Sequence, residues 1–320
     1  MSYKVVIPQD ITDAGKDFLR NKGYEVIVGD GKIDSESLKA IVKDADALLV
    51  RTATYSKEII DAAPNLKVIG RHGVGVDNID VDYCTKKNIW VTFAPQSNAN
   101  SVAEHTMGFL YALAHNFVVM DRETRKGNWE IRNKLKGNDL AGKTLGLVGV
   151  GRIGCMVAQK ASAGAGMNVI GCDPCIPDDK FLSCVTPVKT VEEVFEQADY
   201  VSLHAPCLPQ TRGMVNMSLL SRMKKTAVLI NCARGEIVNE ADLYKALSEG
   251  IIRAAGIEVF VEEPAKADNP LFTLDNVIVT PHSAALTQES MDRMGLHAAM
   301  GIDDALQGKA PQWPVNKPQQ

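Results

Sequence analysis

Three polar residues of the chain are of the types that proton transfer and carboxylate binding require: Arg234, Glu263 and His282. Each follows a short apolar segment with the character of a strand. A histidine paired with a carboxylate keeps one orientation and exchanges a proton with a carbonyl or alcohol oxygen near neutral pH. An arginine fork suits the carboxylate of a substrate. Each residue alone also has a simpler interpretation: Arg234 as a surface charge, Glu263 as a solvated loop acid and His282 as a hydrogen-bonded histidine. The acid–base interpretation therefore requires a fold that brings the three together.

A glycine-rich turn, Gly149-Val-Gly151-Arg-Ile-Gly154, follows the strand-like residues 144–148 and precedes a helical pattern. In this context the first glycine permits a tight turn, the second lets a pyrophosphate approach the backbone, and the third lets helix and strand pack closely. Asp173 comes at the end of the next strand-like segment, where a carboxylate accepts hydrogen bonds from ribose and repels a 2′-phosphate. The spacing predicts that the cofactor is NAD rather than NADP. The alternative is a glycine turn in an α/β protein that binds no nucleotide.

Short β-branched runs alternate with helix-length amphipathic segments along almost the whole chain, which is typical of a parallel sheet with crossover helices. We therefore predict the α/β class. The predicted strands are residues 4–7, 25–28, 47–50, 67–69 and 90–92, and then six more, residues 144–148, 168–172, 200–203, 228–230, 254–259 and 277–280.

Helix signals are clearest at two places. The spacing Ser101-Val-Ala-Glu104 is that of a capping box, and it predicts a long helix from Ser101 to about Lys126, before Gly127. Asn239 is expected to cap a helix that ends at Gly250. Residues 310–320 are rich in Pro and Gln, which predicts a surface segment with little regular structure.

Composition narrows the function classes. A chain of 320 residues suggests two domains, and its formal net charge of −4 offers no basic surface to nucleic acid. The longest apolar stretch, residues 109–120, is too short to span a membrane, and the first residues do not have the pattern of a signal peptide, so a cytoplasmic location is expected. Seven scattered cysteines suit reduced thiols, and the single CxxC spacing of Cys172 and Cys175 does not complete a metal site.

A second glycine-rich segment, Gly70-Arg-His-Gly73-Val-Gly75, also follows a predicted strand. Its spacing does not fit a dinucleotide loop, because Asn78 stands where the third glycine would be. Two interpretations remain open: a nest of backbone N–H groups that holds a small anion, or a glycine-rich turn without a ligand.

The chain resembles the D-isomer-specific 2-hydroxyacid dehydrogenase family over nearly its whole length. In that family the counterpart of Arg234 binds the substrate carboxylate and carbonyl, that of Glu263 supports the histidine, and that of His282 is the acid–base. The stretches that carry the resemblance are residues 49–54, 70–80, 97–104, 149–154, 201–206, 231–235, 263–264 and 280–282.

The resemblance implies a Rossmann-type doubly wound parallel sheet, residues 100–284, inserted into a flavodoxin-like α/β substrate-binding domain made of residues 1–99 and 285–320. Glu258 stands where most members carry an aspartate that hydrogen-bonds the nicotinamide amide. Besides the glycines and Asp173, the cofactor contacts implied by the resemblance are Arg152, Ile153, His204, Thr211, Cys232 and Glu258.

Within the family the likeness is greatest to short D-3-phosphoglycerate dehydrogenases, because Arg51 and Arg71 stand where those enzymes gather positive charge for a phosphate. His72 replaces the usual alanine beside Arg71. Arg132 follows Trp129-Glu130 as a basic residue does in that subgroup, where it reaches the cleft of the neighbouring subunit, so a homodimer is implied. The implied substrate-binding residues are Arg51, Arg71, Val74, Gly75 and Asn98.

Other functions remain open from the sequence. A reductase of hydroxypyruvate, glyoxylate or another 2-keto acid is one alternative, and a non-catalytic NAD(H)-sensing regulator is another. The chain stops soon after its last helical pattern, so we expect no C-terminal amino-acid-sensing domain.

Overall fold

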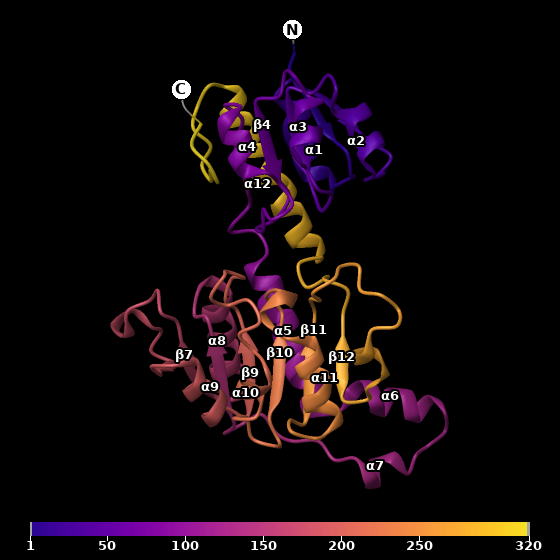
Figure 1. The fold of residues 1–320 in the computed structure, drawn as a ribbon, viewed down its shortest axis with the longest axis vertical. Helices are drawn as coiled ribbons and strands as arrows, with labels where there is room; N and C mark the ends of the chain where they lie inside the picture. Colours follow the sequence, from indigo (N-terminus) through magenta and orange to yellow (C-terminus); the bar gives the residue numbers. More distant parts are fainter. Residues whose placement is uncertain (1, 319–320) are drawn as a thin grey trace. The chain divides into compact units, whose positions relative to one another are not determined.

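The computed structural model describes residues 2–318, and their contacts form two compact units (Figure 1). The first unit contains the residues up to Asn98 together with those from Ala285 onward, and the second contains Ala99–Ala284. Residues 319 and 320 of the predicted C-terminal surface segment lie outside the described residues.

The first unit is built on a five-stranded parallel sheet with the strand order β2-β1-β3-β4-β5, the order of flavodoxin-like folds. Every one of these strands coincides, within a residue or two, with a predicted one. The strands are β1 (Lys4–Ile7), β2 (Glu25–Val28), β3 (Ala47–Val50), β4 (Val68–Arg71) and β5 (Trp90–Thr92).

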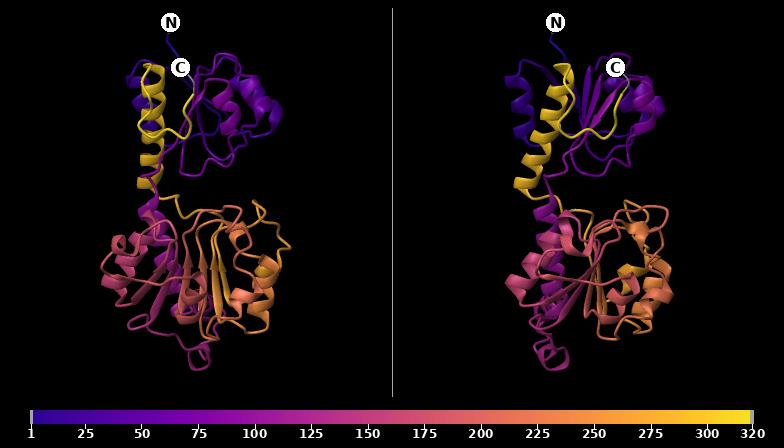
Figure 2. Two further views of the ribbon diagram at one scale, coloured as in Figure 1. Left: turned by 60° about the vertical axis from the view of Figure 1, so that its left-hand side comes forward. Right: turned by 90° about the vertical axis from the view of Figure 1, so that its left-hand side faces the viewer.

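Helices cover both faces of this sheet, which is why its central strands are apolar on both sides. Helices α1 (Asp13–Asn21) and α12 (Gln288–Leu306) pack side by side on one face, as Figure 2 shows. Helices α2 (Ser35–Val42), α3 (Lys57–Asp61) and α4 (Val81–Lys86) contribute to the core on the other face. The end of the chain therefore completes a unit that its beginning starts.

The C-terminal segment lies along the outer edge of this sheet. The backbone N–H of Val315 donates to Val91 O over 2.7 Å, and that of Phe93 donates to Trp313 O over 3.2 Å. As predicted, the described part of the segment has little regular structure, but its hydrogen bonds protect the edge strand β5.

The second unit contains a seven-stranded parallel sheet with the order β12-β11-β10-β9-β6-β7-β8. This is the doubly wound Rossmann order with one additional strand, and its topological switch point lies between β6 and β9. The strands are β6 (Thr144–Val148), β7 (Asn168–Cys172), β8 (Val185–Pro187), β9 (Tyr200–Leu203), β10 (Val228–Asn231), β11 (Ala254–Ile257) and β12 (Val277–Val279).

Helices α5 (Ala99–Ala114) and α8 (Arg152–Ala165) lie on one face of this sheet. Helices α9 (Val191–Gln197), α10 (Met217–Leu220) and α11 (Glu240–Ser248) form the core on the other. The Asn239 side chain accepts from Asp242 N and caps α11, and Gly250 follows the helix with φ +67°, as predicted. The remaining helical segments are α6 (Phe117–Arg125), α7 (Ile131–Lys134), and the 3₁₀ turns η1 (Asp178–Lys180), η2 (Gly235–Ile237) and η3 (Pro270–Thr273).

Two predictions for the second unit are wrong. The single long helix is two helices, because Asn116 adopts a left-handed backbone conformation (φ +57°) that asparagine tolerates better than most residues. The first of them begins at Ala99, so Ser101 lies inside it; the Glu104 side chain bonds to Asn100 rather than closing a capping box. The predicted run of six strands also omitted β8, a three-residue edge strand that ends in proline.

Residues 2–318 contain no helix that is long and apolar enough to cross a membrane. Over the same residues there is no group of three or more His, Cys, Asp or Glu side chains that could hold a metal ion.

Candidate active site

The turn after β6 has the shape that a nucleotide-binding loop requires. Gly149 has φ +92°, and a Cβ there would lie 2.8 Å from the backbone N of Ala205. A Cβ on Gly154 would lie 2.3 Å from Gly149 O, so the helix and the turn pack as closely as the sequence predicted. A Cβ on Gly151 would meet no atom within 4 Å, which leaves open space next to the backbone. The turn therefore fits the close approach of a dinucleotide.

Asp173 is fixed at the end of β7, next to this turn. Its Oδ2 accepts from Val150 N over 2.9 Å and its Oδ1 accepts from Cys175 N over 2.9 Å. Each carboxylate oxygen can accept more than one hydrogen bond, so capacity for ribose hydroxyls remains. Arg152 and Ile153 form the first turn of α8, a 14-residue helix whose N-terminus favours an anion.

The segment after β9 lies against the same turn. A Cβ on Gly149 would lie 2.8 Å from the carbonyl carbon of His204. The His204 Nε2 lies 3.0 Å from Ser202 Oγ, and burial lowers the pKa of His204 to about 4, so the imidazole is neutral at physiological pH. Thr211 Oγ1 donates to Pro206 O and accepts from Leu208 N, which shapes the loop after the strand.

His282 and Glu263, which the sequence predicted to pair, lie in hydrogen-bond contact. His282 Nδ1 lies 2.7 Å from Glu263 Oε2, while Glu263 Oε1 accepts from Phe260 N over 3.0 Å. Because a carboxylate can only accept, Nδ1 carries the hydrogen and Nε2 is the nitrogen left for a substrate. Burial raises the pKa of Glu263, but the hydrogen bonds from His282 and Phe260 and the positive charge of Arg234 lower it more. The carboxylate therefore stays ionised near neutral pH.

Arg234 follows β10 on a turn that a buried asparagine shapes. Asn231 Nδ2 donates to Arg234 O over 2.9 Å, and Asn231 Oδ1 accepts from Ala233 N over 3.0 Å. The Arg234 guanidinium donates to Ala233 O over 2.7 Å, and its charge acts on Glu263. The structure thus brings the three predicted catalytic residues together at the carboxyl ends of β10, β11 and β12.

Two residues of this region were missed by the sequence reasoning. His105, on α5, has its Nε2 3.0 Å from Thr280 Oγ1 and 3.4 Å from Glu258 Oε2. Thr280 lies two residues before His282, in a segment that the sequence had already marked as part of the site. Nothing in the sequence distinguished His105 from other positions on its helix. Cys232 is buried, and burial raises the pKa of its thiol to about 12, so the thiol stays protonated at physiological pH.

The residues predicted to bind substrate lie in the first unit. Arg51 directly follows β3, and Arg71 is the last residue of the neighbouring strand β4. Val50, the last residue of β3, pairs with Arg71 in register. Arg51 Nη1 donates to Asp10 O over 2.9 Å, and Arg71 Nε donates to Gly75 O over 2.8 Å. Both charges lower the pKa of the buried His72, so both guanidinium groups lie within electrostatic reach of one imidazole.

The other three predicted substrate residues form part of the loops at this end of the sheet. Val74 is exposed beside Gly75 in the glycine-rich turn, and Gly73 has φ +145°. Asn98 is the last residue of the N-terminal part of the first unit.

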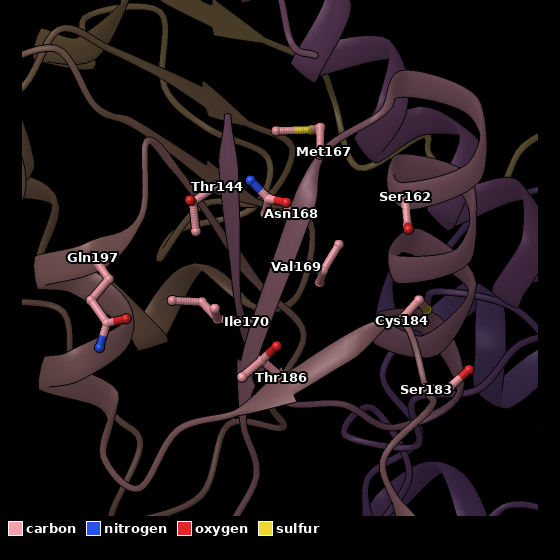
Figure 3. Close-up of a pocket in the computed structure, with 10 residues that line it drawn as sticks. All are labelled: Thr144, Ser162, Met167, Asn168, Val169, Ile170, Ser183, Cys184, Thr186 and Gln197. Atoms are coloured by element: carbon pink, nitrogen blue, oxygen red, sulfur yellow. The ribbon is translucent and has the colours of Figure 1, made fainter. Parts of the chain in front are cut away.

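A separate hollow of about 320 Å³ lies at the opposite end of the second sheet (Figure 3). Thr144, Asn168 and Thr186 line it at the starting ends of β6 and β7 and on β8, with Ser162 of α8 on its wall. It contains none of the residues predicted for the site.

Comparison with known proteins decides the family. Residues 107–284 match the family model described as the D-isomer specific 2-hydroxyacid dehydrogenase, NAD binding domain. The chain belongs to this family. The second unit is accordingly an NAD-binding domain of the D-2-hydroxyacid dehydrogenases, in agreement with the open glycine turn and the placement of Asp173.

The relatives extend the likeness beyond that domain. The D-3-phosphoglycerate dehydrogenase of Methanocaldococcus jannaschii is 44% identical over 98% of this chain, which spans 60% of that relative's length. A protein of Thermus thermophilus with a crystal structure is 33% identical, with a TM-score of 0.91 over 98% of this chain and 100% of its own. D-lactate dehydrogenase from Aquifex aeolicus, complexed with NAD and lactic acid, is 28% identical, with a TM-score of 0.85 over 99% and 100% of the two chains.

Proposed function

We propose that the chain is an NAD-dependent dehydrogenase that interconverts a D-2-hydroxy acid and its 2-keto acid, with 3-phosphoglycerate and 3-phosphohydroxypyruvate as the pair. The observation that carries this proposal is the 2.7 Å contact between His282 Nδ1 and Glu263 Oε2, close to the charge of Arg234, in an NAD-binding domain.

The roles follow from the contacts of each side chain. When bound, NAD supplies the acceptor for the hydride that leaves C2 of the hydroxy acid. His282 Nε2 takes the hydroxyl proton in oxidation and returns it in reduction, and ionised Glu263 stabilises the imidazolium between the two events. Arg234 binds the substrate carboxylate. The backbone amides of Val74 and Gly75 are the proposed substrate contacts of the first unit.

The residues around the glycine turn hold the cofactor. Gly149, Gly151 and Gly154 admit the pyrophosphate, and Asp173 binds the ribose and excludes a 2′-phosphate. Further contacts come from Arg152, Ile153, His204, Thr211 and Cys232.

Two arginines support a phosphorylated substrate. Arg51 and Arg71 place positive charge at the carboxyl ends of two neighbouring strands, together with Asn98 in the substrate-binding unit. A phosphate takes charge-assisted hydrogen bonds from such a pair. The similarity to D-3-phosphoglycerate dehydrogenases points to the same substrate, and such a reaction would supply serine biosynthesis.

Replacement of Arg51 by alanine is expected to raise the KM for 3-phosphoglycerate by about 10- to 100-fold, because a charge-assisted hydrogen bond contributes about 1.5–3 kcal/mol. The KM for an unphosphorylated hydroxy acid should change little. Steady-state kinetics with both substrates checks this, with Arg20→Ala, which removes a surface ion pair on α1, as the matched control.

The same assay tests the proposed function itself. The unaltered protein is incubated with NAD and 3-phosphoglycerate beside glycerate and lactate, and with NADH and hydroxypyruvate or glyoxylate. Equal efficiency on phosphorylated and unphosphorylated forms would assign the chain to the general 2-keto-acid reductases. NAD(H) binding without turnover of any substrate would instead indicate an NAD(H)-sensing regulator.

We also propose that the protein is a homodimer that assembles through α6, α7 and the loop between them, which project from the second unit (Figure 1). Helix α6 buries none of its residues, and Phe117 and Trp129 are 56% and 64% exposed. Large apolar side chains that are exposed on a projecting segment are typical of interaction surfaces. Arg132, whose guanidinium lies over the Trp129 ring, would then reach the partner subunit.

The double substitution Phe117→Asp and Trp129→Asp is expected to convert the dimer to a monomer, because two charges would replace apolar contact area. Sedimentation velocity should show a mass of about twice 34.7 kDa for the parent and of one chain for the variant. Ile33→Asp, at an apolar residue of the first unit that is 54% exposed, is the control and should leave the mass unchanged. A monomeric parent protein would contradict the proposal.

We further propose a cytoplasmic location, in which the seven free cysteines would stay reduced.

A further inference from the structure

We propose that Glu258 is a positioning residue that fixes the segment carrying His282, and that it is not the nicotinamide contact expected from its place in the family. The inference rests on the proposed function, because positioning matters only if His282 transfers a proton.

Glu258 forms hydrogen bonds with every second residue of the segment that carries the histidine: Thr280, His282 and Ala284. Its backbone carbonyl accepts from His282 N over 2.9 Å. Its carboxylate Oε1 accepts from the backbone N–H of Ala284, and its Oε2 accepts from the hydroxyl of Thr280. One residue at the end of β11 thus holds the start, the centre and the end of the segment 280–284.

The carboxylate is directed into the protein. Glu258 is 1% exposed, and His105 Nε2 approaches its Oε2 to 3.4 Å from α5. Burial raises the pKa of Glu258, but the hydrogen bonds from His105 and Thr280 and the N–H of Ala284 lower it more, so the group remains ionised. A buried charge that is satisfied by internal donors is a structural anchor, and it has little access to a ligand.

The conformation of His282 shows why such an anchor is needed. His282 has φ +51°, in the left-handed region that residues with a side chain adopt only when their surroundings enforce it. Its N–H is held by Glu258 O and also by Thr280 O at 3.1 Å. Because Nδ1 must meet Glu263, a small rotation of this segment would move Nε2 away from the substrate.

The length of the Glu258 side chain suits the anchoring role. An aspartate is shorter than a glutamate by one C–C bond, about 1.5 Å. An aspartate at residue 258 would draw the carboxylate back from both Thr280 and Ala284, so the two hydrogen bonds would lengthen and weaken. The length of the glutamate at this position therefore suits the anchoring role.

Variants of Glu258 distinguish the two roles. For a positioning residue, Glu258→Ala should lower kcat by about 10- to 100-fold, because displacement of a catalytic group by about 1 Å has an effect of this size. The Kd for NAD should stay within about threefold. Glu258→Gln, which keeps the length and one acceptor, should restore most of kcat, whereas Glu258→Asp should not.

Two threonine variants test the same network from the other side. Thr280→Val removes the hydroxyl that bonds to Glu258 and should lower kcat without a matching change in the Kd for NAD. The matched control is Thr273→Val, which removes a local hydroxyl bond to Pro270 O in η3 and should leave both constants unchanged.

Amide hydrogen exchange supplies a readout that does not depend on activity. In Glu258→Ala the amide of Ala284 loses its acceptor, the Glu258 carboxylate, and should exchange at least about tenfold faster. The amide of His282 keeps the backbone carbonyl of residue 258 as its acceptor, but it should also exchange faster because the segment around it loses the two side-chain bonds that hold Thr280 and Ala284. Peptides covering residues 149–154 should exchange as in the parent protein.

The proposal is overturned if Glu258→Ala weakens NAD binding tenfold or more while kcat is retained, or if Glu258→Asp binds NAD and turns over as well as the parent. Unchanged exchange at His282 and Ala284 would overturn it as well. If the parent protein oxidises no hydroxy acid at all, the proposed function fails, and the exchange experiment still decides whether Glu258 anchors the segment.

Discussion

Replacement of His282 by alanine is expected to lower turnover by about 10²- to 10⁴-fold, the range typical for loss of a general acid–base. The contact with Glu263 uses Nδ1 of His282 and leaves Nε2 to take the hydroxyl proton, whereas the two oxygens of Glu263 are turned toward His282 and Phe260 N. NADH binding should stay close to the parental value, since the glycine turn and Asp173 do not contact His282 in the structure.

Stopped-flow or steady-state reduction of keto acids, with NADH binding followed by fluorescence, separates these two effects. His115→Ala, at an imidazole between α5 and α6 that stacks on Phe117, is the matched control and should retain activity. A His282→Ala protein that reduced 2-keto acids at the parental rate would remove the basis of the catalytic assignment.

The first unit is expected to lose about 3 kcal/mol of stability through His72 alone as the pH falls from 6.5 to 4. His72 is 4% exposed, and burial, together with the charges of Arg51 and Arg71, lowers its pKa to about 4 from the ordinary value of 6.5. Between these values the unfolded chain binds a proton that the folded unit does not bind. The unfolded state is therefore favoured progressively on acidification, and the contribution is constant above pH 6.5.

The substitution His72→Ala should remove this pH dependence, although it also removes packing and so lowers stability at pH 7. Denaturant unfolding at several pH values, followed by tryptophan fluorescence, measures the stability of the first unit. Trp90 and Trp313 are partly buried in the first unit, whereas Trp129 in the second is largely exposed and should respond little. Parallel stability curves for the parent and the variant between pH 6.5 and 4 would show that His72 is not the responsible group.

The parts of the fold that could be predicted are those in which neighbouring residues determine the geometry. The strand before Gly149 and the helix that begins at Arg152 are encoded within a few residues of the turn, and both are where the sequence placed them. The same is true of the cap at Asn239. The break at Asn116 was missed because a single left-handed residue leaves the hydrophobic pattern of the helix unchanged.

The site could be predicted only in part, because some of its contacts join residues that lie far apart in the sequence. The acid–base pair could be proposed because each member follows a strand of one sheet, and strand ends gather at one edge. The inward orientation of Glu258 could not be proposed, since it depends on His105 from a helix more than 150 residues earlier in the chain. Nor does the sequence reveal that the imidazole of His72 is fully buried next to two arginines.

The packing of α12 against α1 and β4 has a consequence for synthesis on the ribosome. Ala298 and Ile302 of α12 complete the core that begins with Val5 and Ile7, so β1 cannot reach its native burial until α12 has been translated. The nucleotide-binding unit is contiguous and can form in the meantime. One face of the first sheet therefore stays apolar and uncovered until α12 follows, and chaperones bind exposed surface of this kind.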